Sequence, residues 1–114
     1  MKYLILMSVT EGDWDRLGPA EQEEVFRKHE AFEGALRREG KLVSSGRLAP
    51  AADARTVTLR GDRRFVVRDG PFAETKEVVG GYYIIEAESL AEAVEWGKRG
   101  RFIAGSNEVR AILE

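Results

Sequence analysis

The one histidine of this sequence, His29, is the residue best suited to acid–base chemistry, because an imidazole titrates near neutral pH. Apolar residues at positions 25, 32 and 36 share its helical spacing, so His29 lies on the inward stripe of a predicted helix. The ring then faces a cleft between the helix and a sheet, or it is buried and bonded to a backbone carbonyl or a water. The spacing leaves both interpretations open.

A second candidate is Asp69, which opens the stretch Asp69-Gly70-Pro71-Phe72. Glycine tolerates positive φ, and proline fixes its own φ and limits the residue before it, so the two favour a rigid turn next to the carboxylate. The stretch is either a rigid turn whose amides Asp69 satisfies, or a site that presents a catalytic or orienting carboxylate. Glu74 follows in a charged segment and joins this candidate site only if the segment folds back over Asp69; otherwise it belongs to a solvated face.

Other chemistry has less support in the sequence. With no cysteine there is no thiolate metal site and no cysteine nucleophile, and a carboxylate-rich metal site that includes His29 is not required by any spacing. Gly80-Gly81 lacks the pattern of a phosphate-binding loop and indicates a bulge in a strand. We therefore expect neither a metal nor a cofactor. Five aromatic residues line a pocket for a planar ligand or pack in the core or a dimer interface: Trp14, Phe72, Tyr82, Tyr83 and Trp96.

Composition limits the classes of partner. The chain has 114 residues, 43% of them hydrophobic and 33% charged, which predicts a single globular domain over 1–114. Its net charge of −2, without a basic cluster, argues against binding to nucleic acid or to an anionic membrane. The apolar run at 3–7 is too short for a signal peptide core or a membrane span. We expect a cytoplasmic protein.

The periodicity of the apolar residues predicts the elements that must position these side chains. Residues 2–9 and 78–87 form strands, with shorter strands at 41–46 and 108–113. A loop over 12–18 leads into a helix over 20–39 that Pro19 starts and Gly40 ends. A second helix runs from the cap at Ser89 to about residue 98.

Between the shorter strand at 41–46 and the strand at 78–87, residues 56–59 and 65–67 predict a hairpin that turns at Gly61-Asp62. The resulting order is that of an α+β, ferredoxin-like antiparallel sheet with two helices on one face and an inserted β-hairpin. Two helices leave the other face uncovered. We expect a homodimer formed through that sheet face.

The stretch from Asp69 to Glu77, DGPFAETKE, followed by GGYY at 80–83, resembles the signature of the DGPF-motif branch of the YCII-related family. Weaker matches extend the resemblance over most of the chain: Met1-Lys2-Tyr3, His29, Leu48-Ala49-Pro50, Ala93 to Trp96 and Glu108-Val109-Arg110.

The resemblance implies a dimeric α+β barrel and an active-site cleft in which a histidine and an aspartate converge. His29 matches the histidine. The family's aspartate follows the second helix, where this chain has Lys98-Arg99-Gly100-Arg101, so Asp69 is the candidate aspartate here, with Glu74 or Glu77 in reserve.

Two hypotheses follow. The first is a small cofactor-independent enzyme that uses a His29–Asp69 acid–base pair on a small organic acid or lactone. The second is a non-catalytic dimer that binds a small ligand or a protein. The resemblance implies for it a regulatory or stress role linked to sigma factors, since DGPF proteins are similar to companions of extracytoplasmic-function sigma factors.

Overall fold

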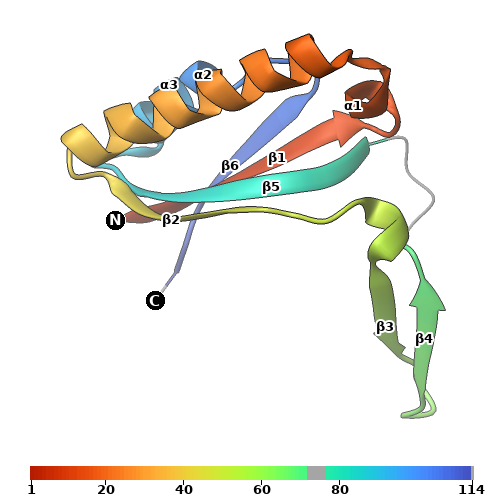
Figure 1. The fold of residues 1–114 in the computed structure, drawn as a ribbon. Coiled ribbons are helices and arrows are strands. Elements are labelled where there is room, and N and C mark those ends of the chain that lie inside the picture. Colours follow the sequence, from red (N-terminus) through yellow and green to blue (C-terminus); the bar gives the residue numbers. More distant parts are fainter. Residues whose placement is uncertain (72–76, 114) are drawn as a thin grey trace.

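The computed structural model describes residues 1–71 and 77–113. Its main sheet has four antiparallel strands in the order β2-β5-β1-β6. Helices α2 and α3 lie together over one face of that sheet, and a separate hairpin of β3 and β4 extends from it (Figure 1). The elements in chain order are β1 (Lys2–Thr10), α1 (Asp13–Arg16), α2 (Pro19–Arg38), β2 (Leu42–Arg47), the 3-10 helix η1 (Ala51–Asp53), β3 (Arg55–Leu59), β4 (Phe65–Asp69), β5 (Glu77–Glu86), α3 (Leu90–Arg99) and β6 (Ser106–Ala111). The predicted ferredoxin-like α+β architecture is confirmed.

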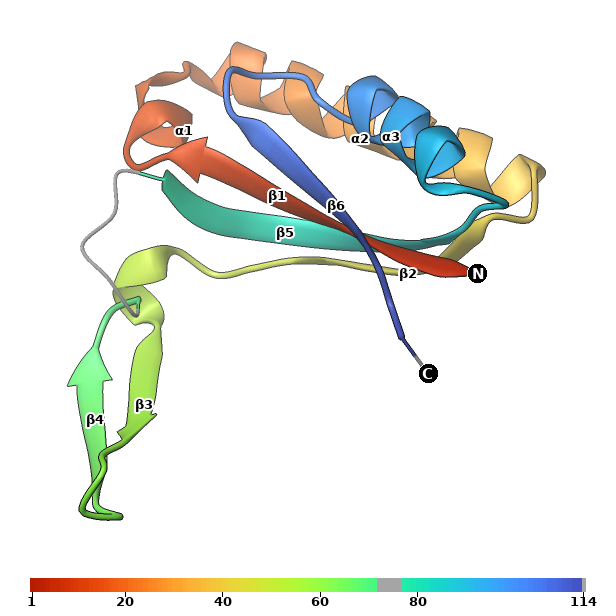
Figure 2. The ribbon, with the colours of Figure 1, turned by 180° about the vertical axis from the view of Figure 1, so that it is seen from behind.

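Strand β1 is apolar on both faces, as its sequence predicts. Tyr3 and Ile5 are buried against the helices, whereas Leu4 and Leu6 lie on the opposite face and stay partly exposed. Successive side chains of a strand point to opposite faces of its sheet. In the view from behind, α2 and α3 lie together on one side of the sheet, and neither covers the opposite face, to which Leu4 and Leu6 belong (Figure 2).

Helix α2 begins and ends where its sequence signals lie. Pro19 occupies its first position, and the Glu21 carboxylate accepts a hydrogen bond from the Gly18 backbone N–H at 3.2 Å. At the other end Gly40 has φ +68°, a left-handed conformation that glycine adopts without strain, and the Lys41 N–H donates to the Leu36 carbonyl. The helix is thus fixed at both ends above the sheet.

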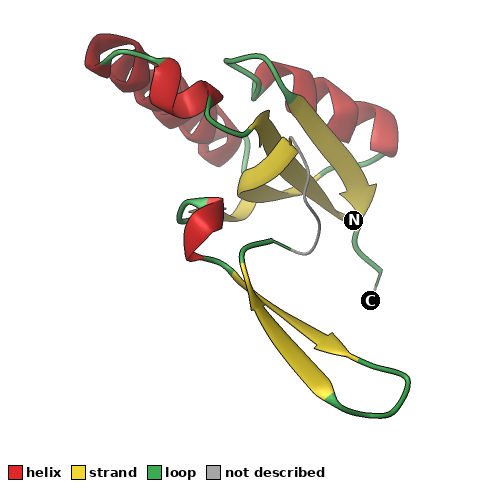
Figure 3. Ribbon diagram, turned by 90° about the vertical axis from the view of Figure 1, so that its right-hand side faces the viewer, coloured by secondary structure: helices red, strands yellow, loops and turns green. Residues whose placement is uncertain are grey.

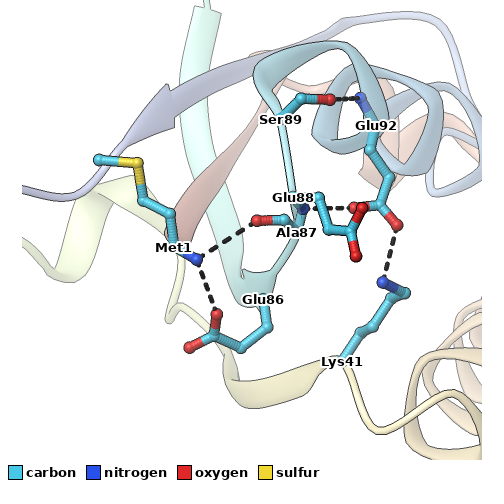
Figure 4. A network of polar contacts seen from close by, with 7 residues as sticks. All are labelled: Met1, Lys41, Glu86, Ala87, Glu88, Ser89 and Glu92. Atoms are coloured by element: carbon cyan, nitrogen blue, oxygen red, sulfur yellow. Dashed lines mark hydrogen bonds and ion pairs between the residues drawn. The ribbon is translucent and has the colours of Figure 1, made fainter.

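A polar network holds α3 and the N-terminus at one end of the sheet (Figure 4). The Glu92 N–H donates to Ser89 Oγ at 3.1 Å, which confirms the predicted cap, while the Glu92 carboxylate accepts from the Glu88 N–H and pairs with Lys41 Nζ at 2.7 Å. The N-terminal amine pairs with the Glu86 carboxylate at 3.1 Å. These contacts fix the start of α3, whose far end leads into the loop at residues 101–105.

Gly80 marks a β-bulge, as the sequence predicts. Met7 pairs with Gly81 and Ser8 with Val79, so Gly80 has no partner in the β1–β5 register. A Cβ at Gly81 would lie 2.9 Å from the Gly46 carbonyl oxygen, which explains the second glycine. The bulge sets which of the two following tyrosines faces the helices.

One local prediction needs correction, and one is confirmed. The loop predicted over 12–18 contains the one-turn helix α1, whose Arg16 N–H donates to the Gly12 carbonyl at 3.1 Å. The hairpin turns at Gly61-Asp62, as predicted, because the Arg63 N–H donates to the Arg60 carbonyl at 2.9 Å and the Arg60 N–H donates to the Arg64 carbonyl at 2.8 Å. A third loop residue, Arg63, follows these two in the left-handed conformation, with φ +67°.

Seen from the side, the β3–β4 hairpin extends well beyond the main sheet (Figure 3). No helix among the described residues is long and apolar enough to cross a membrane.

Candidate active site

His29 lies in the middle of α2 and meets the central strand β5. Its Nδ1 is 3.1 Å from the Tyr83 hydroxyl, and its ring packs edge-on against Phe102 at 4.7 Å between ring centroids. Within the described residues Nε2 has no hydrogen-bond partner. The ring is half-buried, so the structure shows neither a solvated surface histidine nor a sealed core residue.

The position of Tyr83 follows from packing beneath the helix. Tyr83 is 5% exposed, and Phe32 packs edge-on against its ring at 5.1 Å. Phe32 also contacts Phe102 at 6.3 Å between centroids. One aromatic side chain of α2 therefore positions both partners of His29.

His29 and Tyr83 lie on the wall of a pocket of about 650 Å³, within the range of about 300–1,000 Å³ that small-molecule sites occupy. The pocket is bounded by α1, the first half of α2, the end of β2 with η1, the start of β5, and the loop after α3. Aromatic and aliphatic residues dominate this wall, with a few polar groups among them. The polar side chains on this wall include Glu33, Ser45, Arg47 and Arg101.

Burial is the main cause that lowers the pKa of His29 below its ordinary value of 6.5. The positive charge of Arg101 lowers this pKa further, and the negative charge of Glu33 opposes both effects. The imidazole is therefore neutral at pH 7 and has a lone pair to accept a proton. Because the unfolded chain binds this proton more readily, the contribution of His29 to stability is complete above pH 6.5 and is lost as the pH falls through the lower pKa of the folded state.

Burial, assisted by the charge of Glu33, raises the pKa of Tyr83 to about 12. Its hydroxyl is thus protonated at neutral pH and can either donate to His29 Nδ1 or accept from it. Glu33 accepts a hydrogen bond from Ser45 Oγ and pairs with Arg37 at 3.4 Å. The Glu33 carboxylate is therefore already engaged beside the tyrosine.

Arg101 supplies a positive charge to the pocket wall without using a carboxylate to hold its position. Its guanidinium donates to the carbonyls of Ile103, Ala104 and Ser106 and to Asn107 Oδ1, at 2.9–3.3 Å. All four acceptors are uncharged, so these hydrogen bonds orient the side chain without pairing its charge, which the nearby carboxylate of Glu77 offsets in part. A pocket wall with this charge favours an anionic ligand.

Arg47 contributes a second cation at the end of β2. Its guanidinium carbon lies 4.7 Å from the centroid of Phe26 and 5.6 Å from that of Trp14, which pack edge-on against each other at 5.2 Å. Cation–π contacts hold a guanidinium in place while its N–H groups remain able to donate. Phe26 is 42% exposed, and its ring forms part of this contact surface for Arg47.

The structure does not bring Asp69 to His29 within one chain. Asp69 ends β4 on the projecting hairpin, its side chain is 87% exposed, and its carboxylate pairs with Arg55 Nε at 3.1 Å. It is absent from the described wall of the pocket that contains His29. Glu74 lies outside the described residues.

Two residues at the site were not selected from the sequence as chemical groups. Tyr83 was named only among aromatic residues that line a pocket or pack in the core, because the face that it occupies depends on the bulge at Gly80. Arg101 was considered only as part of the segment 98–101, which has no carboxylate. The available signal was that this segment is basic where the resemblance predicts an acidic residue near the histidine.

Within the described residues no group of three or more histidine, cysteine, aspartate or glutamate side chains is placed to hold a metal ion. The groups that the described pocket wall brings together are an imidazole, a neutral phenol and two guanidinium groups.

In a comparison with known protein families, residues 1–114 match the model of the YCII-related domain. The chain belongs to the YCII-related domain family. It is also 34% identical over 115 residues to an uncharacterized protein of Rhizobium meliloti (strain 1021), across 98% of this chain and 92% of that relative. The YCII-related domain thus accounts for the whole chain, with His29, Tyr83 and Arg101 inside the matched region.

Proposed function

We propose that this YCII-related chain is a small cofactor-independent enzyme that moves a proton within a small organic acid or lactone, with His29 as the acid–base group. One observation carries the proposal: Nδ1 of a neutral imidazole is held by Tyr83, while Nε2 has no hydrogen-bond partner in the described structure, at the wall of a pocket of about 650 Å³. The stretch at Asp69–Glu77 supports placing the chain in the DGPF-motif branch.

The charges around the pocket suggest the ionic form of the substrate. Arg47 and Arg101 provide guanidinium groups that suit a carboxylate. An anion bound beside Arg101 offsets the positive charge that lowers the pKa of His29. Substrate binding therefore raises the affinity of the imidazole for a proton at the moment when it must accept one.

Tyr83 takes, in this proposal, the orienting role that was expected of Asp69. In one tautomer Nδ1–H donates to the tyrosine oxygen, and Nε2 takes a proton from the carbon next to the substrate carbonyl. In a substrate with a carbon–carbon double bond beside that carbon, the imidazolium then returns the proton to the far carbon of the double bond, and the double bond moves by one position. The bonding electrons stay in the substrate as a conjugated enolate between the two transfers, so neither an oxidant nor a reductant is needed.

A ligand screen tests the proposed substrate class. Thermal unfolding is measured with a panel of small carboxylic acids and lactones, each acid beside its neutral amide. We expect some acids to raise the melting temperature and their amides not to do so. Replacement of Arg47 by glutamine should abolish the selectivity, whereas Arg27→Gln, which alters an exposed arginine on the outer face of α2, should preserve it. If no acid on the panel is preferred to its amide, the proposed substrate class is wrong.

A further inference from the structure

The β3–β4 hairpin carries its apolar side chains on an open face. Val57 pairs with Val67 and Leu59 with Phe65 across the two strands, so all four side chains share one face. They are 59–70% exposed: Val57 62%, Leu59 59%, Phe65 70% and Val67 62%. Arg55 and Asp69 form an ion pair at the base of the same face. A contiguous apolar face of this kind in a soluble domain marks a contact surface.

The described part of the same chain does not cover this face. The hairpin extends away from the main sheet, on the side opposite α2 and α3 (Figures 1 and 3). The radius of gyration is 16.0 Å, compared with about 13 Å for a compact domain of this length. A two-stranded hairpin is marginal in water without packing partners. Each copy of the hairpin therefore needs a surface from another molecule.

The uncovered face of the main sheet lies on the same side. Leu4 pairs with Ile84 and Leu6 with Tyr82, and these four partly exposed side chains form its apolar centre. The four strands of this sheet have six to ten residues each and lie about 4.8 Å apart, which gives a flat footprint of about 500 Å², whereas a stable interface buries about 800 Å² on each partner. The sheet face alone is therefore small for a stable dimer, and the hairpin faces add the area that is missing.

We propose that the β3–β4 hairpin is an arm that packs its apolar face against a second copy of this chain. A second copy is present wherever the chain is, and at the same concentration. It can therefore cover the exposed hairpin face of every molecule. A twofold arrangement uses the same patch on both copies, so a single association covers both arms and the two sheet faces between them. The inference concerns assembly and does not depend on the proposed chemistry of His29.

The register of the hairpin provides a matched pair of variants. Leu59→Glu with Phe65→Lys replaces one cross-strand pair of the apolar face by opposite charges, which continue to favour strand pairing. Thr58→Glu with Val66→Lys makes the same change on the opposite face. By sedimentation equilibrium we expect the wild type and the second variant to be dimers, and the first to have a dimer dissociation constant at least about 100-fold higher. A monomeric wild type, or equal dissociation constants for the two variants, would overturn the proposal.

The absence of native cysteine gives a readout on the arm itself. Phe65→Cys introduces a single thiol in the outermost pair of the apolar face, and its alkylation rate should fall as the protein concentration rises through the dissociation constant. The single thiol of Arg60→Cys, in the exposed loop at the tip, should react at the same rate at all concentrations. Dimers in which the thiol at position 65 reacts as fast as in monomers would show that the arm packs elsewhere, and the proposal would fail.

Discussion

Replacement of His29 by glutamine is expected to slow turnover of the acid or lactone substrate by about 10²–10⁴-fold, the usual contribution of a positioned acid–base group. Glutamine preserves polarity at the position but cannot accept and return a proton. Exchange of substrate carbon-bound hydrogen in D₂O, followed by NMR, measures the proton transfer directly. Binding of the acid should weaken only a few-fold, because the charges of Arg47 and Arg101 remain.

The control for this variant is Lys28→Gln, on the exposed side of the same helix. It should exchange substrate hydrogen at the wild-type rate and unfold at a similar temperature. If His29→Gln retains the wild-type exchange rate, the imidazole is not the acid–base group, and the chain is better described as a binding module.

Phe32→Ala is expected to lower the free energy of unfolding by about 3–5 kcal/mol, the range for truncation of a buried aromatic side chain. Phe32 is 5% exposed and packs against Tyr83 and Trp96 at 5.1 and 6.0 Å between centroids. It also fills the space beside Gly100, where a Cβ would lie 2.8 Å from its ring. Alanine leaves a cavity that these rigid neighbours cannot close, and Tyr83 loses the support that positions it for His29.

Denaturant unfolding followed by circular dichroism measures this loss. The matched control is Phe26→Ala on the same helix, which removes a ring that is 42% exposed and should cost about 1 kcal/mol, through the lost aromatic contact with Trp14. Equal losses for the two variants would contradict the assignment of Phe32 as the residue that supports the site.

The fold was predictable because its signals are local and agree with one another. Pro19 and Gly40 bound the first helix, Ser89 caps the second, and Gly80 marks the bulge; each acts through its own backbone geometry. Helix α1 lacks such periodicity because one turn is too short to show it. The hairpin turn was predictable from Gly61 and Asp62, which occupy its two central positions, whereas nothing in the sequence marked the left-handed conformation of the next residue, Arg63.

The site was predictable only in part. The position of His29 on the inward stripe follows from spacing along a single helix. A pair between His29 and Asp69 depends instead on the direction in which the inserted hairpin leaves the sheet, and apolar periodicity does not encode that direction. Once the register of the hairpin is known, it places Arg55 directly opposite Asp69. Cross-strand register therefore predicts the partner of Asp69 better than its motif does.

The most direct test of the central claim is a pH titration of the His29 imidazole by NMR, which is simple because the chain has one histidine. We predict a pKa below 6.5 in the free protein, raised by Arg101→Gln and lowered further by Glu33→Gln, since their charges act in opposite directions on it. A bound carboxylate should raise the pKa in the wild type. A pKa at or above 6.5 that none of these changes moves would show that His29 is not in this electrostatic environment, and the acid–base proposal would be wrong.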